Sequence, residues 1–367
     1  MSFSGSYRSE DVRFLLTPIA LEPIGDLEEK ERLIQSGRRH YSEMLSPEAL
    51  PSASYLNLYE RAFAANRGKM AADCLRLAAL IARRRAGPIT LVSLARAGTP
   101  VGVILGHLLR QAFGRPCAHY SVSIIRDRGI DAVALAHILE QGHRPESIVF
   151  IDGWTGKGVI SRELARAVSG YNARHGCAID PGLYVLSDLA GSAACAASSD
   201  DYLIPSSILN ATVSGLVSRS VLNDAIGPHQ FHGCVYYAQF AAHDRSRQFA
   251  DALLADALAL VARDGVPAPG ADPVAVDAPA MAARSGAYMA RASRQYGIAD
   301  VNLIKPGIGE ATRVLLRRVP QRLIVRDEEA PDVAHLLLLA SEKAVPVTIE
   351  PALPYQAVAL IRSAVDG

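Results

Sequence analysis

The residue types best suited to bind phosphate groups occur in two glycine-containing turns, each between an apolar run and an amphipathic stretch. The first turn (residues 152–158) has the sequence Asp-Gly-Trp-Thr-Gly-Lys-Gly. Backbone N–H groups at the start of a helix attract anions, and the Thr155 hydroxyl and the Lys157 ammonium add a donor and a charge. Asp152 is placed to accept hydrogen bonds from a ribose diol. The residues expected to bind phosphate and ribose are Asp152, Gly153, Thr155, Gly156, Lys157 and Gly158.

The second turn (residues 95–100) has the sequence Ala-Arg-Ala-Gly-Thr-Pro and also precedes a helical stretch. A planar guanidinium such as that of Arg96 suits bidentate binding of a phosphate group. Two phosphate-binding turns on neighbouring strands predict a ligand with phosphates at both ends of a sugar. The candidate residues here are Arg96, Ala97, Gly98 and Thr99.

Two other interpretations of the first turn are available. It is not a Walker A motif, because that motif needs a glycine in place of Ile151 and a hydroxyl side chain in place of Gly158. An ATPase is therefore disfavoured. A tight strand–helix turn with a solvent-facing Lys157 remains open as a purely structural interpretation.

The order of strand, acid, Thr-Gly loop and helix resembles the diphosphoribosyl-binding signature of type I phosphoribosyltransferases, in which two acids precede Thr-Gly-x-Thr. Gly153 replaces the second acid here, and Gly158 replaces the last threonine. The resemblance implies that Asp152 stabilises the positive charge that develops on the ribose ring and that the second turn binds pyrophosphate. It also implies Mg²⁺ as a cofactor, held through the diphosphate and not directly by the protein.

The same resemblance gives roles to two further segments. Arg126 and Arg128 lie in a charged turn where these enzymes carry a mobile hood, which would close over the departing pyrophosphate and exclude water. A solvated hairpin tip is the alternative. Tyr202 and Asn210 follow a later strand, in the region that contacts the base in these enzymes.

Short apolar runs alternate with amphipathic stretches between residues 61 and 263, which predicts a parallel β-sheet covered by helices on both faces. The expected strands are residues 89–94, 120–125, 148–151 and 183–186. Together with the resemblance, this pattern predicts an α/β fold of the type I phosphoribosyltransferase kind. A helical segment (1–60) is expected before this domain, and a linker rich in Pro and Ala (264–284) after it.

A smaller α/β domain is expected over residues 285–367, with a last helix over residues 355–365. Its segment 302–313 places glycines before a helix that carries basic residues, and it resembles the pelota class of RNA-binding domain. The resemblance implies RNA contacts by Lys305, Gly307, Gly309, Glu310 and Arg313. A capped helix with solvated charges in a docking domain is the alternative.

The order of these segments along nearly the whole chain resembles the StiP family, which occurs in bacterial tellurium-resistance and stress gene neighbourhoods and carries the label cysteine protease. A cysteine protease needs a thiol activated by a neighbouring base. Among the five cysteines, only Cys234 has a histidine close in sequence, His232, and this pair defines the protease alternative. The scattered cysteines indicate neither a disulfide framework nor a zinc ribbon.

Composition excludes several classes of protein. The formal charge of +1, from 38 Lys and Arg against 37 Asp and Glu, excludes a histone-like nucleic-acid binder. The chain shows no apolar stretch long enough to cross a bilayer and no signal peptide, so we expect a cytoplasmic protein without a membrane partner. A homodimer is a further expectation.

The expected function is a Mg²⁺-dependent enzyme that acts on phosphoribosyl diphosphate or a nucleotide-type ligand. It would make or break an N-glycosidic bond and carry a C-terminal domain that binds structured RNA. Two alternatives remain open. One is a sensor that binds the same ligand without turnover and reports through its RNA-binding domain, and the other is the cysteine protease.

Overall fold

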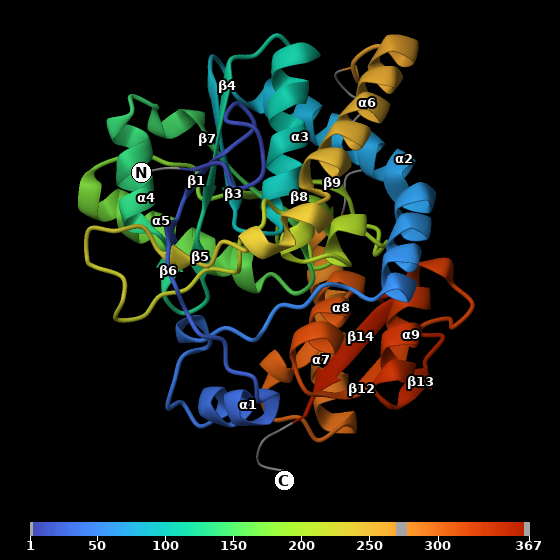
Figure 1. Ribbon diagram of the computed structural model, residues 1–367. Coiled ribbons are helices and arrows are strands. Elements are labelled where there is room, and N and C mark those ends of the chain that lie inside the picture. The colour runs from blue at the N-terminus through green and yellow to red at the C-terminus, as the bar shows by residue number, and fades with distance from the viewer. Residues whose placement is uncertain (1–2, 269–276, 363–367) are drawn as a thin grey trace.

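The computed structural model describes residues 3–268 and 277–362, arranged as a larger core and a smaller C-terminal domain (Figure 1). The core contains a six-stranded β-sheet in the order β1-β4-β3-β7-β8-β9, and every neighbouring pair of strands is parallel. Its strands are β1 (Arg13–Leu15), β3 (Ile89–Leu94), β4 (Cys117–Val122), β7 (Ile148–Thr155), β8 (Leu183–Asp188) and β9 (Cys195–Ser198). The expected α/β fold with a parallel sheet is confirmed, and each predicted strand overlaps one of these.

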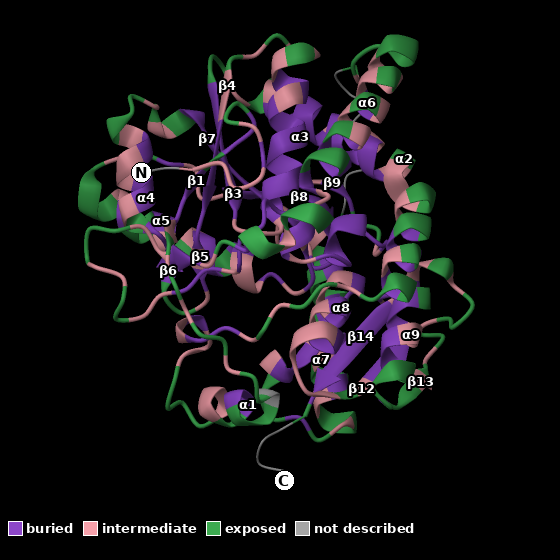
Figure 2. Ribbon diagram, viewed as in Figure 1, coloured by how far each residue is buried: buried purple, intermediate pink, exposed green. Residues whose placement is uncertain are grey.

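Helices cover both faces of this sheet (Figure 2). Those on one face are α2 (Ala53–Arg84), α3 (Gly98–Gln111) and α6 (Ser246–Asp264), and those on the other are α4 (Ala132–Glu140) and α5 (Val159–His175). Neighbouring residues of a strand point to opposite faces, so Leu91 belongs to one apolar cluster and Val92 to the other. Because both faces of the sheet are buried, most of its strands consist largely of apolar residues, and such runs can be recognised in the sequence. No described helix is long and apolar enough to cross a membrane.

The segment before residue 60 contains more than the expected helices. Helix α1 (Leu27–Gln35) begins after Asp26, whose side chain accepts hydrogen bonds from two N–H groups of the first helical turn. The segment also adds β1 to the edge of the central sheet. A strand of three residues is too short to leave a recognisable pattern in the sequence. The boundary expected at residue 60 lies inside α2.

The C-terminal domain has its own four-stranded sheet in the order β11-β14-β12-β13. Its strands are β11 (Ile304–Pro306), β12 (Pro320–Val325), β13 (Val347–Ile349) and β14 (Ala357–Ile361). Its helices are α7 (Ala278–Gln295), α8 (Ile308–Arg317) and α9 (Ala334–Glu342). Two short strand pairs accompany the core, namely β2 (Thr17–Pro18) with β10 (Gly233–Cys234) and β5 (Ile124–Ile125) with β6 (Gly129–Ile130).

The helix predicted over residues 355–365 is wrong. Residues 357–361 form strand β14, which is fully buried and pairs with β11 and β12. A short apolar run fits a buried strand and a buried helix equally, so periodicity alone cannot separate them. Residues 363–365 of that prediction, and residues 269–276 of the expected linker 264–284, lie outside the described residues.

Asp201, in the loop after β9, joins the core to the C-terminal domain. Its carboxylate accepts hydrogen bonds from the N–H groups of Ile308 (3.0 Å) and Gln356 (2.8 Å). Because Ile308 is the first residue of α8, the carboxylate also lies at the positive end of that helix. Burial raises the pKa of Asp201 to about 6, although the N–H groups that it accepts from oppose this shift.

Replacing Asp201 with alanine is expected to weaken the attachment of the C-terminal domain. Two buried N–H groups would lose their acceptor, which lowers the free energy of unfolding by about 2–4 kcal/mol. Urea denaturation followed by circular dichroism measures this loss. Asp200→Ala is the matched control, because Asp200 is exposed and pairs with Lys69, and surface ion pairs contribute about 0–1 kcal/mol. Equal losses in the two variants would contradict the anchoring role.

Candidate functional site

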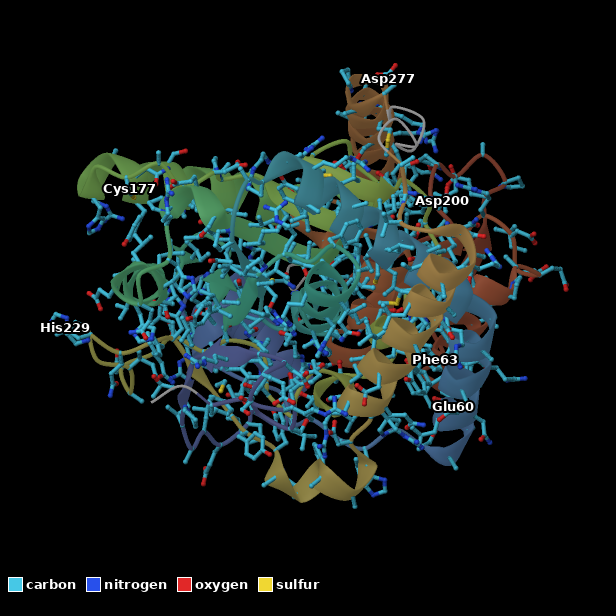
Figure 3. The ribbon with its side chains drawn as sticks, turned by 90° about the horizontal axis from the view of Figure 1, so that it is seen from above. Glu60, Phe63, Cys177, Asp200, His229 and Asp277 are labelled. Atoms are coloured by element: carbon cyan, nitrogen blue, oxygen red, sulfur yellow. The ribbon has the colours of Figure 1, made fainter. Side chains whose placement is uncertain are left out.

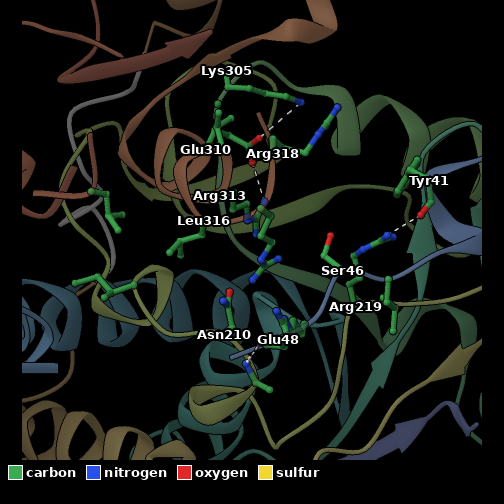
Figure 4. A pocket seen from close by; sticks show the side chains of 18 of the residues that line it. Tyr41, Ser46, Glu48, Asn210, Arg219, Lys305, Glu310, Arg313, Leu316 and Arg318 are labelled. Carbon is green, nitrogen blue, oxygen red and sulfur yellow. Dashed lines mark hydrogen bonds and ion pairs between the residues drawn. The ribbon is translucent and has the colours of Figure 1, made fainter. Parts of the chain in front are cut away.

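A cavity of about 750 Å³ lies between the core and the C-terminal domain (Figure 4). Its walls come from several parts of the chain, including the N-terminal segment around residues 41–52, the first turn at the end of β7, and helix α8. We call it the interdomain cavity. The carboxyl ends of parallel strands are where α/β sheets bind ligands, and the volume suits a nucleotide-sized molecule.

The first turn lines the interdomain cavity as a loop that leads from β7 into α5. Gly158 has a φ of +71°, a left-handed conformation that favours glycine, and its N–H donates to the Thr155 hydroxyl at 3.1 Å. The Lys157 ammonium donates to the backbone oxygens of Val301 (2.8 Å) and Ile304 (3.0 Å). Lys157 therefore faces the C-terminal domain and the cavity, and the interpretation with a purely solvent-facing lysine does not describe it.

Burial moves the ionisation of both charged groups of the first turn toward neutral pH. It raises the pKa of the Asp152 carboxyl to about 6, although Arg313 opposes the shift. It lowers the pKa of the Lys157 ammonium to about 7, and the charge of Lys305 adds to this effect. Groups that titrate near pH 7 are suited to proton transfer, and an anion bound beside Lys157 would favour its charged form.

Arg96 is the residue of the second turn that reaches the interdomain cavity. Its guanidinium donates to the backbone oxygen of Val217 at 2.8 Å and pairs with Glu48 at 3.0 Å. Glu48 comes from the N-terminal segment, and Arg96 is mostly buried beneath it, so this ion pair fixes the guanidinium in the cavity wall. A ligand would therefore meet an arginine that is already oriented.

The other candidates of the second turn, Ala97, Gly98 and Thr99, are absent from the lining of the interdomain cavity, although the structure describes all three. Thr99 is fully buried, and its hydroxyl forms a hydrogen bond with that of Ser121 at 2.8 Å. A Cβ at Gly98 would lie 2.4 Å from the backbone oxygen of Ile151, so the start of α3 packs against β7. Of the four residues predicted for the second phosphate site, all of which the structure describes, only Arg96 lines the interdomain cavity.

The charged turn that contains Arg126 and Arg128 is the tip of the β5–β6 hairpin. The N–H of Arg126 donates to the Tyr41 hydroxyl at 2.8 Å, and its guanidinium lies 5.3 Å from the centre of the Tyr41 ring. Arg126 lines the interdomain cavity, whereas Arg128 pairs with Glu43 outside the lining. The solvated hairpin tip therefore describes Arg128, and Arg126 is placed to meet a ligand.

The two candidates for base contacts are separated. Asn210 lines the interdomain cavity close to Glu48 (Figure 4). Tyr202 is buried away from the lining, and the Lys69 ammonium lies 4.8 Å from the centre of its ring. Of this pair, Asn210 is the residue placed to contact a ligand.

The edge of the C-terminal domain that was assigned to RNA packs against the first turn. A Cβ at Gly309 would lie 2.2 Å from the ring of Trp154, and a Cβ at Gly156 would lie 2.6 Å from the backbone oxygen of Pro306. Both positions therefore need glycine for this approach. The guanidinium of Arg313 lies 4.7 Å from the centre of the Trp154 ring, a cation–π contact between the domains.

Three residues of the same edge, Lys305, Glu310 and Arg313, line the interdomain cavity (Figure 4). Glu310 pairs with Arg313 at 2.7 Å and with Lys305 at 4.0 Å. Gly307 has a φ of +90° and lies against Leu189 of the core. The residues predicted for RNA and those predicted for phosphate therefore meet at one cavity, a proximity that the sequence did not indicate.

Several charged residues of the interdomain cavity were not among the predicted candidates. Nine Lys and Arg line it against five Asp and Glu, so it is basic although the whole chain is nearly neutral. The additional basic residues are Lys30, Arg219, Arg317 and Arg318, and the additional acids include Glu48. Adjacent arginines at the end of α8 were the one local signal, because the other residues come from segments far apart in the sequence.

Cys234, the cysteine of the protease alternative, lacks the features of an activated nucleophile in this structure. Cys234 is fully buried, and burial raises the pKa of its thiol to about 12. The His232 ring forms its hydrogen bond with the Ser123 hydroxyl at 2.7 Å, and no hydrogen bond to Cys234 occurs among the described residues. Cys177 lies across the molecule from Asp200 and the C-terminal domain (Figure 3). The described residues therefore contain no Cys234–His232 dyad.

Replacing Gly309 with alanine is expected to push the C-terminal domain away from the first turn. The new Cβ would overlap the ring of Trp154, the single tryptophan of the chain, so tryptophan fluorescence reports on the surroundings of this one ring. We expect the emission maximum to shift to longer wavelength as the ring meets water. Gly286→Ala is the matched control, because a Cβ there meets nothing within 4 Å. Emission that is unchanged in Gly309→Ala would rule out the contact.

Two hypoxanthine phosphoribosyltransferase structures from Trypanosoma cruzi resemble parts of this chain. One is 10% identical in sequence and covers 37% of this chain and 82% of its own, with a TM-score of 0.28. The other, a variant complexed with the product IMP, is 11% identical and covers 48% of this chain and 90% of its own, with a TM-score of 0.27. Because both TM-scores are low, neither likeness bears on the activity of this chain.

Family comparisons cover far more of the chain. Residues 5–254 match the family described as tellurite-like stress resistance cysteine protease StiP, and residues 283–363 match the PELOTA RNA binding domain. A protein of Acinetobacter baylyi called cysteine protease StiP is 42% identical over 376 residues, which cover 100% of this chain and 96% of that protein. This chain therefore belongs to the StiP family and carries a pelota-type domain at its C-terminal end.

Proposed function

We propose that this protein is a phosphoribosyltransferase-like enzyme that binds phosphoribosyl diphosphate or a nucleotide-type ligand in the interdomain cavity and makes or breaks an N-glycosidic bond. The observation that carries the proposal is the shape and charge of one cavity. The lining of this cavity contains Asp152, the Thr155–Gly158 loop, Arg96 and a surplus of basic side chains. Stress-related metabolism is the setting that the family's description supports.

In the synthetic direction, the bond between ribose C1 and the diphosphate oxygen breaks, and the electron pair leaves with the diphosphate. A nitrogen lone pair of the acceptor forms the new bond to C1, and the acceptor then loses its proton. Positive charge builds on the ribose ring between these events. The Asp152 carboxylate, when ionised, stabilises that charge, and the first turn binds the 5-phosphate. Arg126 and Arg96 would stabilise the negative charge that leaves.

Magnesium fits this site as a partner of the diphosphate. Mg²⁺ is usually bound by one or two carboxylates together with substrate phosphates and waters. Asp152 supplies a carboxylate in the cavity, while Glu310 is already paired with Arg313. Among the described residues, no cluster of three or more His, Cys, Asp or Glu could hold a metal without the ligand. When bound, the ion would neutralise charge on the leaving diphosphate.

Asp152→Asn is expected to reduce turnover far more than binding. The amide keeps the shape of the side chain but removes the charge that stabilises the ribose ring in the transition state, so turnover should fall by about 100-fold or more. Binding of phosphoribosyl diphosphate, measured by calorimetry with and without Mg²⁺, should change by less than about tenfold. Turnover is measured as pyrophosphate released in the presence of a panel of nucleobases.

The matched control for this experiment is Asp264→Asn at the exposed end of α6, which should leave both quantities unchanged. Failure of the parent protein to bind phosphoribosyl diphosphate, with or without Mg²⁺, would contradict the proposal. Binding without any pyrophosphate release would favour the second candidate function, which is a sensor without turnover.

The sensor is favoured by one specific observation, the packing of the pelota-type edge directly on the first turn. Gly153 stands where the resembled enzymes have a second acid, which is consistent with a loss of catalysis. In this second candidate, the ligand holds Lys305, Glu310 and Arg313 at the cavity, and structured RNA competes for the same edge. RNA affinity should then fall as phosphoribosyl diphosphate is added, whereas an enzyme with an independent RNA site would show no such competition.

The protease alternative gives a separate prediction. If Cys234 were a nucleophile, Cys234→Ala would abolish peptide cleavage and Asp152→Asn would spare it. Because the Cys234 thiol is buried and protonated, we expect the parent protein to cleave no peptide in a mixed peptide library analysed by mass spectrometry. Cleavage that is lost in Cys234→Ala would establish the protease instead.

A further inference from the structure

Apart from Lys157 of the first turn, three basic side chains of the interdomain cavity form no ion pair with an acid among the described residues. They are Lys30 on α1, Arg219 in the loop before β10, and Arg317 at the end of α8. The other arginines nearby are neutralised, because Arg96 pairs with Glu48 and Arg318 pairs with Glu31. Three separate segments of the chain therefore bring uncompensated positive charge to one cavity.

Each of these side chains has donor groups left over. Lys30 is only 5% exposed, and its ammonium bonds to a single neutral group, the Ser46 hydroxyl. Arg219 donates to the backbone oxygens of Tyr41 and Met44, while its Nη1 is buried and has no hydrogen-bond partner among the described residues. No hydrogen bond or ion pair joins Arg317 to another described residue. Buried lysines and unsatisfied buried donors are rare unless something outside the chain completes them.

The three groups also act on one another. Burial lowers the pKa of Lys30 to about 7, and the charges of Arg219, Arg318 and Arg317 add to the shift. Burial likewise lowers the pKa of Arg317 to about 9, with Arg96, Arg313 and Arg219 contributing and the Glu48 carboxylate opposing the shift. All three groups line the same cavity, so an anion bound near them would stabilise their charged forms.

The cluster is distinct from the first turn. The charged groups that shift the pKa of Lys157 are Lys305, Glu310, Asp300 and Arg126. Lys30, Arg219 and Arg317 line the cavity from α1, from the loop before β10 and from the end of α8, whereas Lys157 lies in the loop between β7 and α5.

We propose that Lys30, Arg219 and Arg317 form a second anion subsite, which binds a phosphate or diphosphate group while a sugar phosphate lies at the first turn. The anion subsite is independent of the proposed function, whereas the sugar phosphate at the first turn rests on it. The group comes either from the diphosphate arm of the same ligand or from the phosphate of a second substrate. An ammonium and two guanidinium groups supply the several donors that a tetrahedral dianion accepts.

Calorimetry with inorganic pyrophosphate, ribose 5-phosphate and phosphoribosyl diphosphate tests the subsite on the full chain. Arg317→Met and Lys30→Met should each weaken pyrophosphate binding by about tenfold or more, since each removes a charge-assisted donor. The same variants should change ribose 5-phosphate binding by less than about twofold. Lys157→Met should show the reverse pattern. Arg263→Met, at the exposed end of α6, controls for the loss of any one positive charge.

The two sources of the anion give different results with phosphoribosyl diphosphate. If the diphosphate arm occupies the subsite, Arg317→Met weakens its binding about as much as that of pyrophosphate. If a second substrate occupies the subsite, Arg317→Met leaves the binding of phosphoribosyl diphosphate unchanged. The same variant then abolishes the binding of pyrophosphate to protein that is already saturated with phosphoribosyl diphosphate. Both results support the subsite.

The proposal is overturned if pyrophosphate does not bind the parent protein, or if Arg317→Met and Lys30→Met leave its affinity unchanged. Pyrophosphate binding that depends on Arg317, in a protein that binds neither ribose 5-phosphate nor phosphoribosyl diphosphate, would leave the subsite intact and reject the proposed function. The midpoint of thermal denaturation, measured for each variant, shows whether the variant still folds. Because each variant removes an uncompensated buried charge, its midpoint should equal or exceed that of the parent protein.

Discussion

The close approach of the C-terminal domain to the first turn is the contact on which the rest of the structure depends. Gly156 lies against the backbone of Pro306 and Gly309 against the ring of Trp154, at separations that leave no room for a Cβ. Because of this fit, the interdomain cavity has walls from both domains, and its charges come from both. A site inside one domain is largely fixed by that domain alone, whereas a site between two domains also depends on how they dock.

Charge in the interdomain cavity is divided between oriented and free groups. Glu48 and Glu310 pair with Arg96 and Arg313 and so fix where those guanidinium groups lie. Arg317, by contrast, has no such partner among the described residues. An uncompensated charge in a confined space costs stability when the cavity holds only water, and an anion that enters it relieves this cost. Under the proposed function, the same surplus of positive charge would favour anionic ligands.

The parts of the fold that depend on a local pattern could be predicted from the sequence. Strands such as β3 and β7 are buried on both faces, so they appear as unbroken apolar runs, and the glycines and threonine of the first turn follow β7 directly. Strands β1 and β14 were not predicted, because a run of a few residues is compatible with more than one kind of secondary structure. The interdomain cavity could not be predicted for another reason. Gly156 and Gly309 are far apart in the sequence, and nothing near either one specifies the partner against which it packs.

The pelota-type edge has a chemistry that suits two kinds of ligand. A glycine turn with Lys305 and Arg313 beside it provides positive charge and close access to a backbone, as an RNA phosphate requires. A small phosphorylated ligand requires the same two properties. With Trp154 and the first turn packed against this edge, its Lys305, Glu310 and Arg313 face the interdomain cavity. In the docked arrangement, the C-terminal domain therefore supplies part of the wall of the interdomain cavity, and under the proposed function the two uses of the edge would compete.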